Sequence, residues 1–142
     1  MKIALGGDHA GFHYKEGIKK YLQEKGHDVM DFGPENANSV DYPDFVHPAA
    51  TSVANGDNQF GILICGSGNG VCMTANKHQD IRAGYCWNTE IAALSREHNN
   101  ANMMCLPARF LAYEYAEQIV DAFLSAEFQG GRHQRRVEKI SC

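Results

Sequence analysis

The 142-residue sequence predicts one α/β domain, a three-layer α/β/α sandwich around a five-stranded parallel sheet of the Rossmann-type, flavodoxin-like class. Two observations predict it. Short apolar runs alternate with amphipathic helical patterns along the chain, which is typical of a parallel sheet covered on both faces. The run 60–65 is apolar throughout, as expected of a central strand that is buried on both sides. We find no internal repeat or linker that would divide the chain.

Each element has its own local signal. The first helix has an apolar stripe and a glycine stop at Gly26. Pro43 opens the second helix, where a missing N–H costs nothing. The last long helix carries an apolar stripe over 112–124. The predicted strands span residues 2–6, 27–32, 60–65, 81–86 and 103–106. The predicted helices follow the strands over residues 12–25, 43–55, 70–77, 88–97 and 112–124, with a helical turn or two in 132–140.

Composition narrows the function class. The net charge of −4 argues against a nucleic-acid binder, and an anionic ligand would need locally concentrated positive charge. No apolar run approaches the roughly 18 residues of a membrane span, and the first is too short for a signal peptide. The five cysteines form an odd set without a CxxC pair, so zinc and disulfide interpretations are weak. Free thiols suit a reducing cytosol, and we therefore expect a cytoplasmic protein.

The segment 65–70, Cys-Gly-Ser-Gly-Asn-Gly, joins the most buried strand to a short helix. Glycines there let consecutive backbone N–H groups point at one anion or developing oxyanion. A plain tight turn is an equal alternative. The segment lacks the P-loop lysine and the GxGxxG pattern, so nucleotide sites are poor interpretations. Cys65 could act as a thiolate base or nucleophile, or be a small buried side chain. We assign that second role to Cys72, Cys86 and Cys105, which lie within apolar patterns.

Three other segments carry candidate polar groups. Asp8 and His9 follow the first strand and could bind a sugar hydroxyl or a phosphate, although Asp8 could equally cap a helix. His98 ends a helix with a side chain suited to proton transfer near neutral pH, or simply to a helix C-terminus. In parallel folds ligands bind at the carboxyl ends of the strands. We therefore expect segments 7–11 and 65–70 and the region of His98 to converge there.

The only concentrated positive charge lies in 130–136. If this stretch is helical, Arg132 and Arg136 share one face, where two guanidiniums fit the oxygens of a phosphate. A solvated basic tail is the alternative.

Together these segments resemble the ribose-5-phosphate isomerase B family, which also includes galactose-6-phosphate isomerase subunits. The resemblance covers nearly the whole chain, and its marks are residues 7–11, 41–43, 65–70, 75–77, 95–99 and 130–133. Ser67 stands where threonine is common, so a hydroxyl is kept. Another branch uses a glutamate directly after the loop as its base. That position is Val71 here, which leaves Cys65 as the plausible base.

The resemblance implies interconversion of D-ribose 5-phosphate and D-ribulose 5-phosphate in the non-oxidative pentose phosphate pathway, without metal or organic cofactor. It implies Cys65 as the base, loop amides with Ser67 as stabilisers of the enediolate, and His98 as the ring-opening group. The implied substrate contacts are Asp8, His9, Tyr42, Gly66, Ser67, Gly68, Asn69, Gly70 and Asn99. The implied arginines are Arg109, Arg132 and Arg136, the last two chiefly for phosphate.

The resemblance also implies a homodimer with the active site between subunits, and we expect residues 127–142 to pack on the partner. Pairing of dimers into tetramers stays open. The alternatives are an isomerase of a six-carbon aldose 6-phosphate (allose or galactose 6-phosphate), a nucleotide- or flavin-binding module, and a catalytically silent subunit. Retention of Cys65, Ser67 and His98 argues against the last.

Overall fold

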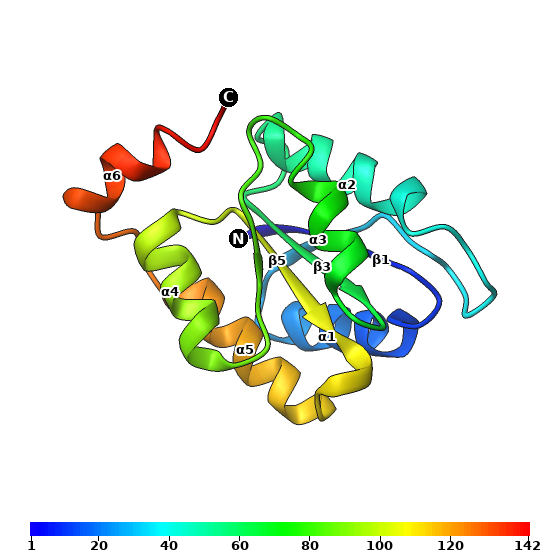
Figure 1. The fold of residues 1–142 in the computed structure, drawn as a ribbon. Helices are drawn as coiled ribbons and strands as arrows, with labels where there is room; N and C mark the ends of the chain where they lie inside the picture. Colours follow the sequence, from blue (N-terminus) through cyan, green and yellow to red (C-terminus); the bar gives the residue numbers. More distant parts are fainter.

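The computed structural model describes residues 1–142 and contains one five-stranded parallel sheet with helices on both faces (Figure 1). The strands are β1 (Lys2–Gly7), β2 (Asp28–Asp31), β3 (Phe60–Cys65), β4 (Ala83–Tyr85) and β5 (Met103–Pro107). The helices are α1 (Phe12–Glu24), α2 (Pro43–Ala54), α3 (Asn69–Ala75), α4 (Thr89–Asn99), α5 (Tyr113–Ser125) and α6 (Arg132–Val137). The three-layer sandwich predicted from the sequence is confirmed.

The strand order is β2-β1-β3-β5-β4, with every neighbouring pair parallel. A flavodoxin has the order 2-1-3-4-5, so the last two strands are exchanged relative to that fold. The order reverses between β1 and β3, whose register pairs Gly7 with Ile64. This switch point is where a doubly wound sheet opens a crevice at the carboxyl ends of its strands.

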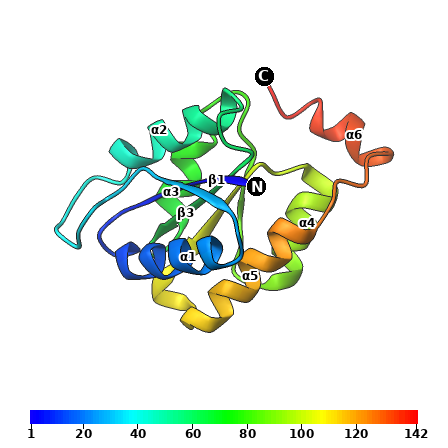
Figure 2. The same ribbon diagram turned by 180° about the vertical axis from the view of Figure 1, so that it is seen from behind.

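The two faces of the sheet have separate cores. Helices α1, α4 and α5 bury side chains such as Ile18, Ala92 and Phe123 against one face. Helices α2 and α3 cover the other face, where Val46 and Val71 are fully buried. Figures 1 and 2 show these two layers on opposite sides of the sheet. Cys65 belongs to the α2/α3 side, so that side carries the predicted chemistry.

Most element boundaries agree with the predictions to within a few residues. Helix α1 ends before Gly26, whose φ of 86° permits the reversal that L side chains disfavour. Strand β4 is shorter than predicted, and the Arg82 amide just before it donates to Oδ1 of Asn102 at 2.9 Å. The short 3-10 turn Ala108–Phe110 was not predicted. No helix combines the length and the apolar character needed to cross a membrane.

Candidate active site

The loops after β1 and β3 meet at the switch point. The Asp8 amide donates to the carbonyl of Ile64 at 3.2 Å, which joins the two loops. A Cβ on Gly11 would lie 2.2 Å from the same carbonyl oxygen, so only glycine permits this approach. The predicted convergence of segments 7–11 and 65–70 is confirmed.

Cys65 is nearly inaccessible, with 4% of its surface exposed, at the end of β3. The Gly68 amide donates to its Sγ at 3.1 Å. Ser67 is exposed and its Oγ accepts from the Asn69 amide at 3.4 Å. A buried thiol held by an amide, beside an exposed hydroxyl, suits proton abstraction next to a developing oxyanion.

Aromatic rings hold this loop in place. Gly68 has a φ of 74°, and a Cβ there would lie 2.6 Å from the Tyr85 ring. The Tyr85 hydroxyl donates to the Ser67 carbonyl at 2.8 Å. On the other side, a Cβ on Gly70 would lie 2.5 Å from the Tyr42 ring. The glycines therefore serve close packing as well as the turn itself.

Arg109 also reaches the loop. Its amide donates to the Gly66 carbonyl at 3.0 Å, and its guanidinium lies against Gly66. The side chain is exposed, with no carboxylate paired to it. Arg109 therefore places a positive charge beside the loop, where it could contact a bound substrate, as the family resemblance implies.

Asp8 and His9 line a hollow of about 590 Å³ with Tyr42 and the segment 39–44. One Asp8 oxygen accepts from the amides of Ala10 and Gly11, at 2.9 and 3.0 Å. Asp8 thus stabilises the turn before α1, whose first turn has no side-chain cap. The Val40 amide donates to Nδ1 of His9 at 3.2 Å. Neutral His9 therefore carries its proton on Nε2, which can donate to a ligand.

The expected convergence of the His98 region with these loops is wrong within one chain. Helix α4 runs back from the carboxyl edge and ends near the start of β4, where Arg82 Nε donates to the Asn99 and Asn100 carbonyls at 3.2 and 3.0 Å. The five-residue β5 separates this end from the Cys65 edge by roughly 13–17 Å. A helix antiparallel to the strands must end at the amino edge, which the sequence interpretation overlooked.

Helix α6 lies at the same far edge, so Arg132 and Arg136 are also remote from Cys65 (Figure 1). The Gln129 amide donates to the Glu97 carbonyl at 3.0 Å and ties the segment to α4. The His98 and His133 rings stack with centroids 4.2 Å apart. Partial burial, followed by the charges of His98 and the neighbouring arginines, lowers the pKa of His133. The far edge thus brings His98 and His133 together with the arginines of α6.

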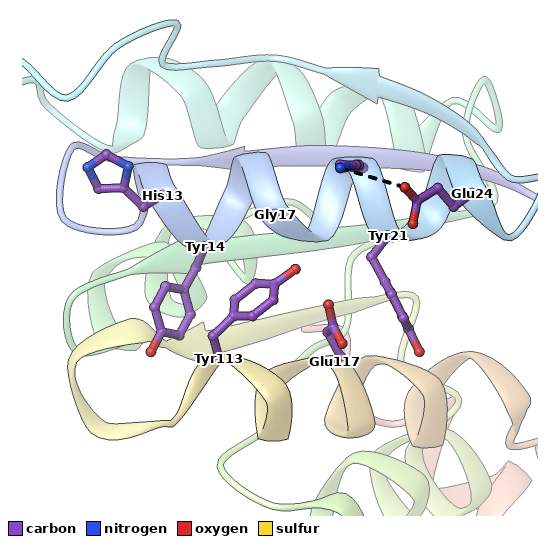
Figure 3. A pocket seen from close by; sticks show the side chains of 8 residues that line it. His13, Tyr14, Gly17, Tyr21, Glu24, Tyr113 and Glu117 are labelled. Carbon is purple, nitrogen blue, oxygen red and sulfur yellow. Dashed lines mark ion pairs between the residues drawn. The ribbon is translucent and has the colours of Figure 1, made fainter.

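The sequence interpretation missed Tyr85 and Val40, which position the loop and His9. Neither residue type signals such a role, because one acts through its place on β4 and the other through its backbone amide. A further hollow of about 550 Å³ lies between α1 and α5, on the opposite face of the sheet (Figure 3). Tyr14, Tyr21 and Tyr113 line it, and none of the predicted site residues does.

The chain is similar to known sugar-phosphate isomerases over nearly its whole length. Residues 3–140 match the family described as Ribose/Galactose Isomerase. The chain is 45% identical over 141 residues to ribose-5-phosphate isomerase B of Escherichia coli (strain K12), covering 99% of this chain and 95% of that protein. It is 42% identical over 142 residues to D-erythrulose-4-phosphate isomerase of Pectobacterium atrosepticum, covering 99% and 93%.

Solved structures are equally similar. Clostridium thermocellum ribose-5-phosphate isomerase B superposes with a TM-score of 0.97 at 48% identity, covering 99% of this chain and 95% of that one. The Mycoplasma genitalium enzyme with bound ribulose-5-phosphate superposes with a TM-score of 0.93 at 45% identity, covering 98% and 93%.

Proposed function

Because this chain belongs to the ribose/galactose isomerase family, we propose that it interconverts D-ribose 5-phosphate and D-ribulose 5-phosphate, a step of the non-oxidative pentose phosphate pathway. The observation that carries the proposal is Cys65, buried at the switch point with an amide donating to its sulfur. The similarity of the whole fold to an enzyme with bound ribulose-5-phosphate supports the same substrate pair. We place the reaction in the cytoplasm.

The reaction moves one proton between neighbouring carbons of the open-chain sugar. The Cys65 thiolate takes the proton from C2 of the aldose, and the electron pair forms an enediolate. The amides of the 66–70 loop and the Ser67 hydroxyl stabilise the oxygen anion, which preorganised donors do effectively. The hydroxyl proton on O2 passes to the anionic O1, and the Cys65 thiol returns its proton to C1, so that the ketose forms with a carbonyl at C2 and a hydroxyl at C1. General base catalysis contributes on the order of 10²–10⁴-fold and one oxyanion donor about 10²–10³-fold, and neither contribution needs a cofactor.

The separation of the two edges supports a homodimer with shared sites. Cys65, Asp8 and Tyr42 lie at one edge, whereas His98 and the α6 arginines lie at the other, so one chain holds an incomplete set. A second copy could bring its far edge to the first copy's Cys65 loop. His98 of the partner subunit would then open the furanose ring, and Asn99 of the partner subunit would bind a hydroxyl. Arg132 and Arg136 of the partner subunit would hold the phosphate.

Exposed apolar side chains support the same arrangement. Met73, Trp87 and Phe110 are 66%, 48% and 74% exposed, and they belong to α3 and to the loops after β4 and β5. Apolar side chains gathered beside a site are typical of an interaction surface. Helix α6 buries none of its residues, which suits packing of the segment 127–142 on a partner.

The test is a coupled assay of the purified protein across aldose phosphates of four, five and six carbons. We expect the highest kcat/KM with D-ribose 5-phosphate. A higher value with allose or galactose 6-phosphate would reassign the substrate. A higher kcat/KM with the four-carbon sugar phosphate would reassign the substrate to that of the Pectobacterium relative. Turnover of none of them would contradict an isomerase.

A further inference from the structure

Two histidines from different elements meet on the α2/α3 side of the molecule. His47 lies on the exposed side of α2, and His78 lies in the turn that follows α3. Their ring nitrogens, Nδ1 of His47 and Nε2 of His78, are 2.9 Å apart. The ring centroids are 5.1 Å apart and the planes are inclined by 50°. Neither histidine belongs to the site assigned above.

The backbone holds His78 in position. Its amide donates to the Ala75 carbonyl at 3.1 Å, and its carbonyl accepts from the Ile81 amide at 3.1 Å. Burial, and to a smaller extent the charge of His47, lowers the pKa of His78. A neutral imidazole is the form that binds metal ions, so this environment favours ligation.

The spacing fits two neighbouring positions around a metal ion. With metal–nitrogen bonds of about 2.0–2.1 Å, ligands at a right angle lie roughly 2.9 Å apart, and ligands at a tetrahedral angle lie about 3.3 Å apart. The observed separation is that of a hydrogen bond between the rings, so a small ring rotation can bring both nitrogens to one ion in either geometry. Among divalent first-row ions, Ni²⁺ and Cu²⁺ lie toward the tight-binding end for nitrogen ligands. His47 is exposed, so its ring can rotate to direct its lone pair at a shared ion.

We propose that His47 and His78 form a two-imidazole binding site for a divalent first-row transition-metal ion, with Ni²⁺ and Cu²⁺ as the best-fitting ions. No third His, Cys, Asp or Glu side chain is placed to join the pair, so water fills the other positions. The hydrogen-bonded pair holds one proton between the rings. On binding, that proton moves to the other nitrogen of its own ring, so both facing nitrogens ligate and no proton is released.

Such an ion would connect two elements that hold the Cys65 loop. Helix α2 begins directly after Tyr42, whose ring packs on Gly70, and α3 continues from the loop itself. A ligand that binds only the folded chain stabilises it by mass action. The expected consequence is a native state that resists heat better when the ion is bound.

The test is calorimetric titration of the untagged full-length protein with NiCl₂ in a buffer without thiols or chelators. Ni²⁺ is chosen because, unlike Cu²⁺, it does not oxidise cysteine. We expect one saturable site per chain. We also expect the unfolding midpoint to rise by roughly 5 °C or more at 100 times the dissociation constant. EDTA should reverse the shift. His47→Gln and His78→Gln should each weaken Ni²⁺ binding by at least about tenfold. Mutation of a residue that only hydrogen-bonds to a metal ligand already causes a loss of that size.

Two matched variants exclude other nitrogen sites. His27→Gln removes an imidazole that lies 3.3 Å from the Met1 amino group, and His133→Gln removes one ring of the stacked pair. Both should bind Ni²⁺ like the original chain. Absence of binding would overturn the proposal, as would binding that His47→Gln and His78→Gln leave unchanged. Loss of binding in His27→Gln or His133→Gln alone would assign the ion elsewhere. The midpoints without metal show whether each variant folds.

Discussion

Among single residues, Cys65 has the most demanding position, because it is nearly inaccessible yet, as the proposed base, would have to reach a substrate carbon. We predict that Cys65→Ala lowers kcat by at least about 10²-fold, since a general base is lost, while D-ribose 5-phosphate still binds. Turnover is measured with the coupled assay, and binding by calorimetry. Turnover close to that of the original chain would contradict the assignment of Cys65 as base.

Tyr85 acts on the loop through one hydroxyl. Burial, with smaller contributions from nearby thiols, raises its pKa, so the hydroxyl stays a donor at neutral pH. Tyr85→Phe removes only the bond to the Ser67 carbonyl. We expect kcat to fall by roughly 2- to 10-fold, the value of one hydrogen bond, with little change in KM. Tyr21→Phe, which loses a bond to Asp121 on α5, is the control and should leave kcat unchanged. Equal effects in both variants would argue against a positioning role.

At the scale of elements, α1 and β2 are joined by a partly buried charge network. Lys15 is fully buried, and its Nζ lies 2.5 Å from Asp31 and 2.7 Å from Glu16. Burial alone would raise the pKa of Asp31, but hydrogen bonds from Lys15 and Lys19 outweigh it and lower the pKa. Because the folded pKa is depressed, the stabilisation is complete above the unfolded value of about 4 and is lost as pH falls through the folded value.

We therefore predict that Asp31→Asn lowers the free energy of unfolding by about 2 kcal/mol at pH 7, less than for a fully uncompensated buried charge, because Glu16 remains. The difference from the original chain should be smaller at pH 3 than at pH 7, because the stabilisation begins to be lost below the unfolded value of about 4. Urea unfolding at both pH values, at one protein concentration, measures it. Glu24→Gln breaks only the exposed pair with Lys20 and should cost less than about 0.5 kcal/mol. A difference that is independent of pH would contradict the linkage.

The Cys65 loop is the element to which we assign the catalysis, and a substitution at Gly68 tests this assignment. Gly68→Ala should cost about 1–2 kcal/mol for the left-handed backbone and, in addition, displace Tyr85 and lower kcat. Gly26→Ala is a matched control, because its φ is also positive but nothing lies within 4 Å of the added Cβ. It should lose similar backbone stability at unchanged kcat. Unchanged kcat in Gly68→Ala as well would show that the close packing has no catalytic role.

At the scale of the whole molecule, the distance between the two edges leads to a complementation test. Cys65→Ala and His98→Asn are each expected to be impaired alone. After the two proteins are mixed and re-paired, about half of the dimers are mixed, and each holds one complete site of two. Activity should therefore recover to about a quarter of the original value. If both residues acted within one chain, no mixed dimer would hold a complete site and no activity would return.

The sequence by itself determined the alternation of strands and helices, the buried run 60–65 and the glycine-rich turn after it. These features are local, since periodicity, glycine and proline act within a few residues. It also supplied the candidate residues, because Cys65 opens that turn and three of the seven residues 130–136 are arginines.

Only the tertiary structure decided which of those residues meet. In the fold, β5 lies between β3 and β4, unlike the flavodoxin order. The β1–β3 pairing places the Asp8 turn beside the Cys65 loop, and the Tyr85 ring packs on Gly68. The fold also sent His98 to the opposite edge, because α4 must run antiparallel to the strands to return the chain to β5. The expectation that the His98 region meets the Cys65 loop came from the general rule for parallel sheets, and within one chain the fold places the two at opposite edges. The reason is physical: contacts between distant segments depend on strand order and helix direction, which no local pattern encodes.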